Sequence, residues 1–139
     1  MPPRASILLL VEDSSDDIRV TLRALSRNFP DLVVEVARDG LEALDALGLD
    51  GTPRGRVPNL VLCDLKMPRV SGDELLRRMR ADEKLKDVPF VVFSSSNERG
   101  DIELCESQGV SEYATKPIGF DEYEQQLVGL VTRHLPSAP

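Results

Sequence analysis

The chain has 139 residues, of which 41% are hydrophobic and 29% are charged, a composition typical of a soluble globular domain and not of a disordered chain. The formal net charge is −7, so the basic face that nucleic-acid binding needs is not expected. Apolar runs fall well short of the roughly 20 residues of a membrane-spanning helix, and the first residues do not resemble a signal peptide, so we expect a cytoplasmic protein that binds no membrane.

The chain begins with an expected strand followed by an amphipathic helix. The run ILLLV at 7–11 is apolar throughout, which is typical of a strand covered on both faces. Apolar residues then recur at helical spacing over 18–29. Ser14 or Ser15 is the candidate N-cap. Two aspartates follow, the second being Asp17, and acids in a first turn favour the helix dipole.

The next segments predict a second strand, a short helix and a loop. LVVEV at 32–36 is rich in β-branched residues, and the charge at Glu35 indicates an edge strand. Leucines spaced three apart over 41–47 predict a short helix that closes near Gly48. The segment 49–58 is rich in glycine, proline and charge, so we expect a loop there.

The second half of the chain continues the alternation. Strands are expected at 60–63, 90–93 and, more weakly, 111–115, and helices at about 72–80, 98–107 and 120–130. Cys63 and Cys105 have no C-x-x-C spacing and are expected to be free thiols. Strands that alternate with helices in this way predict one α/β domain over 1–139, with a parallel sheet covered on both faces.

Charged and hydroxyl side chains follow the strands of this expected sheet. In chain order they are Glu12, Asp13, Asp64, Ser94 with Ser95, and Lys116. The carboxyl ends of parallel strands meet at one edge, which is where such sheets bind ligands. Three crowded carboxylates repel one another unless a proton or a cation joins them, and oxygen ligands suit a hard ion such as Mg²⁺. The lysine and the hydroxyl could then meet an anion beside the ion, and a phosphoryl group fits that description.

Four motifs at these strand ends resemble a response-regulator receiver domain of the CheY-like kind. They are VED, CDLKMPRVSGDELL, FSSS and YATKPI, and the resemblance extends from about Ser6 to His134. It implies a flavodoxin-like, doubly wound (βα)5 fold with five parallel strands in the order 2-1-3-4-5. The extended loop before Asn59 and the long connection 77–101 are most similar to stand-alone regulators that pair with bacterial phytochrome histidine kinases.

The resemblance assigns a role to each acid. Asp64 would be the phosphoacceptor, forming an aspartyl phosphate by attack on a phosphohistidine. Asp13 and Asp64 would bind Mg²⁺ directly, with the backbone carbonyl of Lys66 as a third protein ligand. Glu12, where aspartate is commoner in the family, would act on the ion through water.

The resemblance also implies a switch. Lys116 would pair with Asp64 at rest and with the phosphoryl oxygens afterwards. Ser94 would move its hydroxyl onto the phosphoryl group, and Tyr113 would change rotamer with it. The adjacent Ser95 keeps the choice of serine open, and we favour Ser94 because it directly follows the apolar strand.

The resemblance also implies that three further residues shape the site. Pro68 and Gly72 would shape the loop that carries the acceptor, and Pro117 would follow Lys116 through a cis peptide bond. A cis bond is the minor isomer before proline.

The function implied is that of a single-domain response regulator, phosphorylated by a sensor histidine kinase such as a bacteriophytochrome. We expect it to be no enzyme beyond self-catalysed phosphoryl transfer and slow autodephosphorylation, and to form a homodimer through the fifth strand and the last helix. One alternative is a Mg²⁺-dependent phosphohydrolase that uses Asp64, although Lys66 stands where such an enzyme would carry an acid. The other is a receiver-like interaction module that is never phosphorylated.

Overall fold

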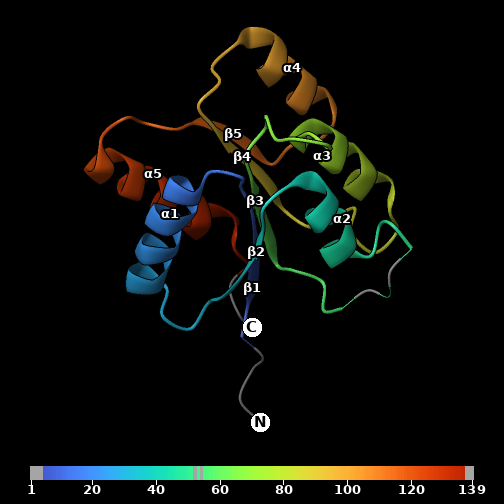
Figure 1. Cartoon of the computed structure of the whole chain (residues 1–139), viewed down its shortest axis with the longest axis horizontal. Coiled ribbons are helices and arrows are strands. Elements are labelled where there is room, and N and C mark those ends of the chain that lie inside the picture. Colours follow the sequence, from blue (N-terminus) through green and yellow to red (C-terminus); the bar gives the residue numbers. More distant parts are fainter. Residues whose placement is uncertain (1–4, 52, 54, 137–139) are drawn as a thin grey trace.

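The computed structural model describes residues 5–51, 53 and 55–136, and strands and helices alternate along this part of the chain (Figure 1). The strands are β1 (Ile7–Val11), β2 (Val33–Ala37), β3 (Leu60–Cys63), β4 (Phe90–Ser94) and β5 (Glu112–Thr115). The helices are α1 (Ser15–Asn28), α2 (Gly40–Leu47), α3 (Gly72–Ala81), α4 (Arg99–Ser107) and α5 (Phe120–His134). The predicted alternation is confirmed, with strands β2 and β5 each starting one residue later than expected.

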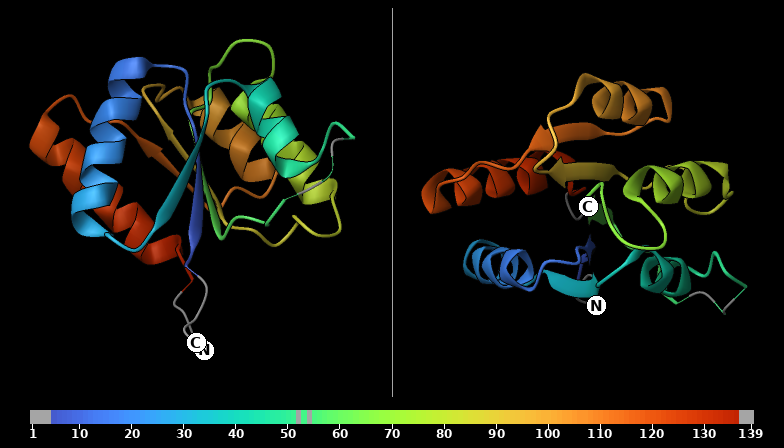
Figure 2. Two further views of the ribbon diagram at one scale, coloured as in Figure 1. Left: turned by 60° about the horizontal axis from the view of Figure 1, so that its bottom comes forward. Right: turned by 45° about the horizontal axis from the view of Figure 1, so that its top comes forward.

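The five strands form one parallel sheet in the order β2-β1-β3-β4-β5, as predicted. Helices α1 and α5 cover one face of the sheet, and α2, α3 and α4 lie on the other (Figures 1 and 2). The strand order reverses at β1, since β2 is added on one side of β1 and the later strands β3, β4 and β5 are added on the other. Ligands of doubly wound sheets bind outside the strand ends at such a reversal.

The continuous apolar runs of the central strands are explained by two separate cores. Along β1, Leu8 and Leu10 pack beneath α1 and α5, whereas Leu9 and Val11 pack against the opposite helices. Strands β3 and β4 divide their side chains in the same way. The edge strand β2 is covered less fully: Val34 and Val36 are partly buried, and Val33 is exposed. Only the central strands therefore need to be apolar on both sides.

Local capping fixes where helix α1 begins. Ser14 is the N-cap, and its hydroxyl accepts a hydrogen bond of 3.2 Å from the backbone N–H of Asp17. The cap satisfies one of the N–H groups that a helix start leaves without a partner. Because α1 follows directly on β1, this cap holds the first turn of α1 beside the carboxyl ends of the strands.

Cys63 and Cys105 are free and buried, as expected, and burial raises the pKa of each thiol.

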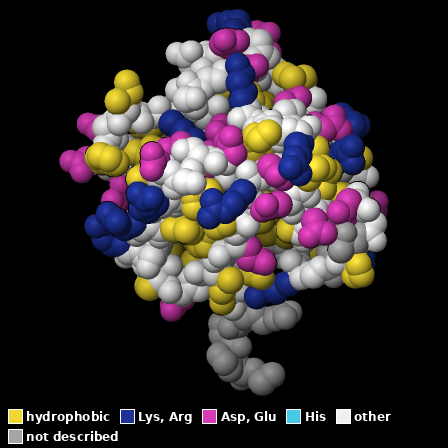
Figure 3. Space-filling model, in the orientation of Figure 1, with side chains coloured by type: hydrophobic (Ala, Val, Ile, Leu, Met, Phe, Trp, Pro, Cys, Tyr) yellow, Lys and Arg dark blue, Asp and Glu magenta, His cyan; other side chains and the backbone are white. Residues whose placement is uncertain are grey.

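Within the described residues, every helix is too short or too polar to cross a bilayer. Figure 3 shows acidic and basic side chains interspersed on one face of the molecule.

Candidate functional site

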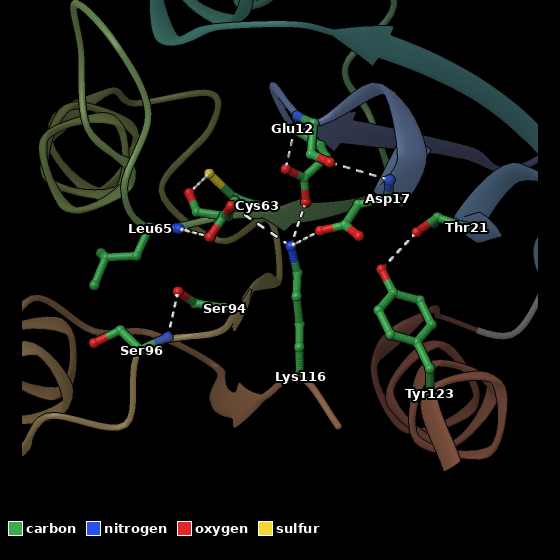
Figure 4. A network of polar contacts seen from close by, with 11 residues as sticks. Glu12, Asp17, Thr21, Cys63, Leu65, Ser94, Ser96, Lys116 and Tyr123 are labelled. Atoms are coloured by element: carbon green, nitrogen blue, oxygen red, sulfur yellow. Dashed lines mark hydrogen bonds and ion pairs between the residues drawn. The ribbon is translucent and has the colours of Figure 1, made fainter. Parts of the chain in front are cut away.

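The sheet register brings the predicted site residues to one rim. The backbone N–H of Asp64 donates to the carbonyl of Val11 (2.9 Å), which places the end of β3 beside the end of β1. The N–H of Lys116 donates in the same way to the carbonyl of Ser94 (2.7 Å), which aligns β5 with β4. Glu12, Asp64, Ser94 and Lys116 therefore meet at the same edge, with several of their side chains pointing toward one another (Figure 4).

Three acids at this rim form a compact oxygen cluster. One carboxylate oxygen from each of Glu12, Asp13 and Asp64 lies within 4.8 Å of the other two. Two ligands on opposite sides of a Mg²⁺ ion are about 4.2 Å apart, given metal–oxygen distances of about 2.1 Å. The set therefore fits a hard divalent cation with a small inward movement, and the exposed side chain of Asp13 leaves the solvent side open for water ligands.

Asp64 is oriented by contacts on both of its carboxylate oxygens. Oδ1 accepts a hydrogen bond of 2.7 Å from the backbone N–H of Leu65, and Oδ2 lies 3.5 Å from the Lys116 ammonium. These contacts fix the rotamer of the carboxylate at the mouth of the rim. The predicted acceptor thus has a defined orientation and lies within reach of both the acids and the cation.

Lys116 forms ion pairs with three acids: Glu12, Asp17 and Asp64. Its Nζ lies 2.6 Å from Glu12 Oε1 and 2.8 Å from Asp17 Oδ2, and only 8% of its side chain is exposed (Figure 4). Burial alone would lower the pKa of Lys116. The hydrogen bond to Asp17 and the charges of Asp64 and Glu12 outweigh that effect and raise the pKa above its ordinary value. The ammonium is therefore charged at neutral pH.

Glu12 is the most buried acid of the cluster. Burial raises the pKa of Glu12 to about 7, against the lowering effect of Lys116 and with a further increase from the charge of Asp64. Oε2 accepts a hydrogen bond of 3.2 Å from the N–H of Ser14, and Oε1 accepts from Lys116. With protein donors on both oxygens, Glu12 suits the indirect role that the resemblance implies, in which it acts on the ion through water.

Asp17 is part of the site, although the sequence indicated only a helix-start acid at this position. Its carboxylate reaches Lys116 from the first turn of α1, whose start Ser14 places at the rim. The available signal was its spacing: Asp17 lies one helical turn beyond Asp13, on a helix that begins where the strand ends. Predicting the contact would also have required the direction in which Lys116 extends.

The serines after β4 occupy different environments. Ser94 is buried, and its hydroxyl accepts a hydrogen bond of 3.2 Å from the N–H of Ser96, while Ser95 is exposed beside a surface cavity that Lys116 also lines. In the described part of the chain, neither hydroxyl is hydrogen-bonded to Asp64. The structure therefore brings Ser94 to the rim without yet joining it to the acceptor.

Tyr113 and Lys66 lie on the α4 side of the rim. The Tyr113 hydroxyl donates to the backbone carbonyl of Ser96 (2.8 Å). Lys66 extends its exposed side chain to Asp101 on α4, with Nζ 3.6 Å from Oδ2, and the Ser96 hydroxyl donates to the same oxygen at 2.5 Å. The two loops on this side of the acceptor thus meet at Asp101. That the Lys66 carbonyl is a metal ligand stays a prediction.

The acceptor loop is shaped by close backbone packing. A Cβ added at Gly72 would lie 2.5 Å from the carbonyl oxygen of Asp64, so a larger residue would displace the acceptor. The N–H of Val70 donates to the carbonyl of Pro68 (2.9 Å), and Arg69 between them has a φ of 72°. The turn therefore consists of a proline, a strained residue and a glycine that admits no side chain.

The predicted cis bond is wrong. No peptide bond among the described residues is cis, so Lys116 and Pro117 are joined in the trans form. The trans isomer is intrinsically preferred before proline by about 0.5–1 kcal/mol. Lys116 makes its contacts to Glu12 and Asp17 from this trans backbone, so the reach of the cation does not require the minor isomer.

Comparison with known proteins accounts for this arrangement of residues. The family model of the response regulator receiver domain matches residues 8–128. The chain is 32% identical over 133 residues to the response regulator Rcp1 of Synechocystis sp., with 93% of this chain and 87% of the relative covered.

Solved structures agree with the sequence comparison. The Mn²⁺-bound form of Rcp1 has a TM-score of 0.84 and 30% identity, covering 96% of this chain and 97% of the other. The phosphorylated cyanobacterial phytochrome response regulator RcpA has a TM-score of 0.86 and 32% identity, covering 97% of both chains. A family match over most of the chain, a fold shared along nearly its full length and acids at the expected strand ends lead to one conclusion: the chain belongs to the response regulator receiver domain family of two-component signalling.

Proposed function

We propose that Asp64 accepts a phosphoryl group from a sensor histidine kinase, with Mg²⁺ bound by the acids of the rim. The observation that carries this proposal is the setting of Asp64, whose carboxylate lies between the oxygen cluster formed with Glu12 and Asp13 and the buried ammonium of Lys116. A nucleophile in this setting can approach an anionic phosphoryl group, because positive charge compensates the repulsion.

The transfer exchanges one bond for another. A carboxylate oxygen of Asp64 attacks the phosphorus of a phosphohistidine, the phosphorus–nitrogen bond breaks, and the released imidazole nitrogen takes up a proton. Mg²⁺, when bound at Asp13, Asp64 and the Lys66 carbonyl, would neutralise negative charge on the phosphoryl oxygens. Lys116 contributes the second cation and approaches the same oxygens from the side of β5.

Phosphorylation then biases a switch on the α4 side. Ser94 would leave the N–H of Ser96 to donate to a phosphoryl oxygen, and this loosens the loop whose carbonyl accepts from Tyr113. Helix α4 follows that loop and buries only Cys105 in the core, so its position can change at low cost. The surface formed by α4 and β5 would therefore exist in two states whose populations the phosphoryl group shifts.

We further infer the place of this switch in the cell. The likeness to Rcp1 and RcpA favours a phytochrome-type histidine kinase as phosphodonor, and hence a cytoplasmic location. The acidic net charge argues against direct contact with nucleic acid or anionic membranes. A homodimer through β5 and α5 is supported by the position of β5 at the free edge of the sheet.

The experiment that tests the proposal follows the mass of the intact protein. The purified chain is incubated with Mg²⁺ and acetyl phosphate, alongside Asp64→Asn and the control Asp121→Asn, which removes an exposed acid in the first turn of α5. We expect one phosphoryl adduct on the wild type and on the control, and none on Asp64→Asn. The absence of an adduct on the wild type, together with absence of Mg²⁺ binding, would favour an interaction module that is not phosphorylated.

The same experiment addresses the enzymatic alternative. A phosphohydrolase would release phosphate continuously and accumulate little adduct. The residue two positions after the acceptor is Lys66, and its ammonium pairs with Asp101 on α4. A lysine in this position cannot act as the general base that hydrolysis of the aspartyl phosphate would need, so we expect the adduct to persist for minutes.

A further inference from the structure

The buried ammonium of Lys116 is shared among three carboxylates, and the sharing is unequal. The distances to Glu12 and Asp17 are 2.6 and 2.8 Å, within the usual range for charge-assisted hydrogen bonds. The distance to Asp64 is 3.5 Å, which is an ion pair without a well-formed hydrogen bond. At rest, the short bonds of the cation therefore go to the two acids that are not the proposed acceptor.

Asp17 is held in place for this contact. The Ser14 hydroxyl caps its backbone N–H, and the first turn of α1 directs its carboxylate toward the rim (Figure 4). Its side chain is 37% exposed, whereas that of Glu12 is 3% exposed. Water can replace the ammonium at Asp17 far more easily than at Glu12, so Asp17 is the partner that Lys116 can leave at the lower cost.

We propose that Asp17 is a positioning residue that holds the ammonium of Lys116 on the α1 side of the site in the unphosphorylated protein. The ammonium must leave Asp17 to make a short contact with a phosphoryl group on Asp64. Asp17 therefore competes with the incoming phosphoryl group for the same cation. This inference rests on the proposed function, because it assigns Asp17 a role in phosphorylation of Asp64.

The neighbouring residue provides a matched control. Asp16 lies in the same helical turn, and its side chain is 89% exposed. It forms an ion pair of 3.9 Å with Arg19, which is not one of the residues of the rim. Asp16→Asn and Asp17→Asn remove the same charge from adjacent positions. Only Asp17→Asn weakens the hold on Lys116, so a difference between the two variants reports position and not net charge.

The kinetic test measures the second-order rate constant for adduct formation from acetyl phosphate at fixed Mg²⁺. We expect Asp17→Asn to raise this constant about fivefold, the effect of removing one partly screened charge from a shared cation. Asp16→Asn should stay within about twofold of the wild type, since its charge is screened by water. Asp17→Glu, which restores the carboxylate, should return the constant toward the wild-type value. Equal effects at positions 16 and 17, or no change in Asp17→Asn, would overturn the proposal.

A second readout does not depend on phosphorylation. Proton–nitrogen spectra tuned to lysine ammonium groups, recorded without added metal or phosphodonor, should show a slowly exchanging Lys116 signal in the wild type and in Asp16→Asn. In Asp17→Asn we expect that signal to shift and to exchange faster, because one of its short bonds is weakened. An unchanged signal would refute the positioning role. If the wild type acquires no phosphoryl group, the proposed function fails, and the spectra still decide whether Asp17 holds Lys116.

Discussion

The two sides of the rim hold their lysines in opposite ways. Lys116, on the side of α1 and β5, is almost fully buried and makes two short contacts to carboxylates. Lys66, on the side of α4, is 63% exposed and lies 3.6 Å from its one acid, Asp101. A buried pair is costly to break from one side, whereas an exposed pair contributes little. The buried contact between Lys116 and Glu12 is thus costly to break, whereas the exposed pair between Lys66 and Asp101 can open at little cost.

Replacement of Lys116 should have the largest effect. In Lys116→Met the buried Glu12 loses its cation, and we expect the free energy of unfolding at pH 8 to fall by about 3 kcal/mol. The loss should be smaller at pH 5.5, because Glu12, whose pKa is already raised to about 7, can take up a proton there. Urea unfolding at the two pH values measures both effects. An equal loss at both pH values would show that Glu12 is not the group left without a partner.

The second largest effect is expected in the pH dependence of Mg²⁺ binding. The pKa of Glu12 is raised, so the proton is held up to about pH 7 and the acid cluster carries one charge less below that value. If Glu12 must be ionised to support the ion, the affinity for Mg²⁺ should fall about tenfold from pH 8 to pH 6. Calorimetric titrations at several pH values measure this. Glu12→Gln should flatten the profile, and the same slope in that variant would assign the proton to another group.

On the α4 side, we expect the hydroxyl of Ser96 to contribute to the stability of the fold, although this residue is partly exposed. It donates to Asp101 and accepts from the N–H of Glu98, so it ties the loop after β4 to the first turn of α4. We expect Ser96→Ala to lower the free energy of unfolding by about 1 kcal/mol. Ser95→Ala, at the exposed neighbouring position, should change it by less than about 0.5 kcal/mol. Equal losses in Ser96→Ala and Ser95→Ala would show that the Ser96 hydroxyl does not stabilise the link between this loop and α4.

The smallest effect is expected at Lys66. The pair with Asp101 is largely solvated, so Lys66→Met should change the free energy of unfolding by less than about 0.5 kcal/mol. The contrast with Lys116→Met is the sharpest test of the difference between the two sides, because the same substitution is made at two lysines of one rim. Comparable losses at the two positions would contradict it.

Much of this site could be predicted because the ends of the strands can be identified from the sequence. The runs at β1, β3 and β4 are continuous and apolar, so Glu12, Asp64 and Ser94 stand out as the first polar residues after each. The order of the strands came from the family resemblance, since periodicity shows which segments are strands but not which are neighbours. The position of Asp17 could not be predicted, because it depends on the rotation of α1 about its axis and on the direction of a long lysine side chain.

Two other features show where sequence reasoning ends. The isomer of a bond before proline is set by small energy differences, and the expectation for Pro117 was wrong. The meeting of Lys66, Ser96 and Asp101 joins side chains from two loops and a helix start. Neither hydrophobic periodicity nor a motif specifies how two loops approach each other, because loop conformations are decided by many weak contacts.

One buried cysteine lies in α4 and another in β3, and the rates at which their thiols are alkylated can report how often each element opens. Cys105 is the residue by which α4 enters the core, so an alkylating reagent reaches its thiol when that helix lifts from the sheet. Cys63 lies in the central strand β3, and its alkylation requires the sheet itself to open. The ratio of the two modification rates, read by mass, therefore reports how often α4 detaches while the rest of the molecule stays folded. Because no thiol needs to be introduced, the natural chain can be followed before and after phosphorylation.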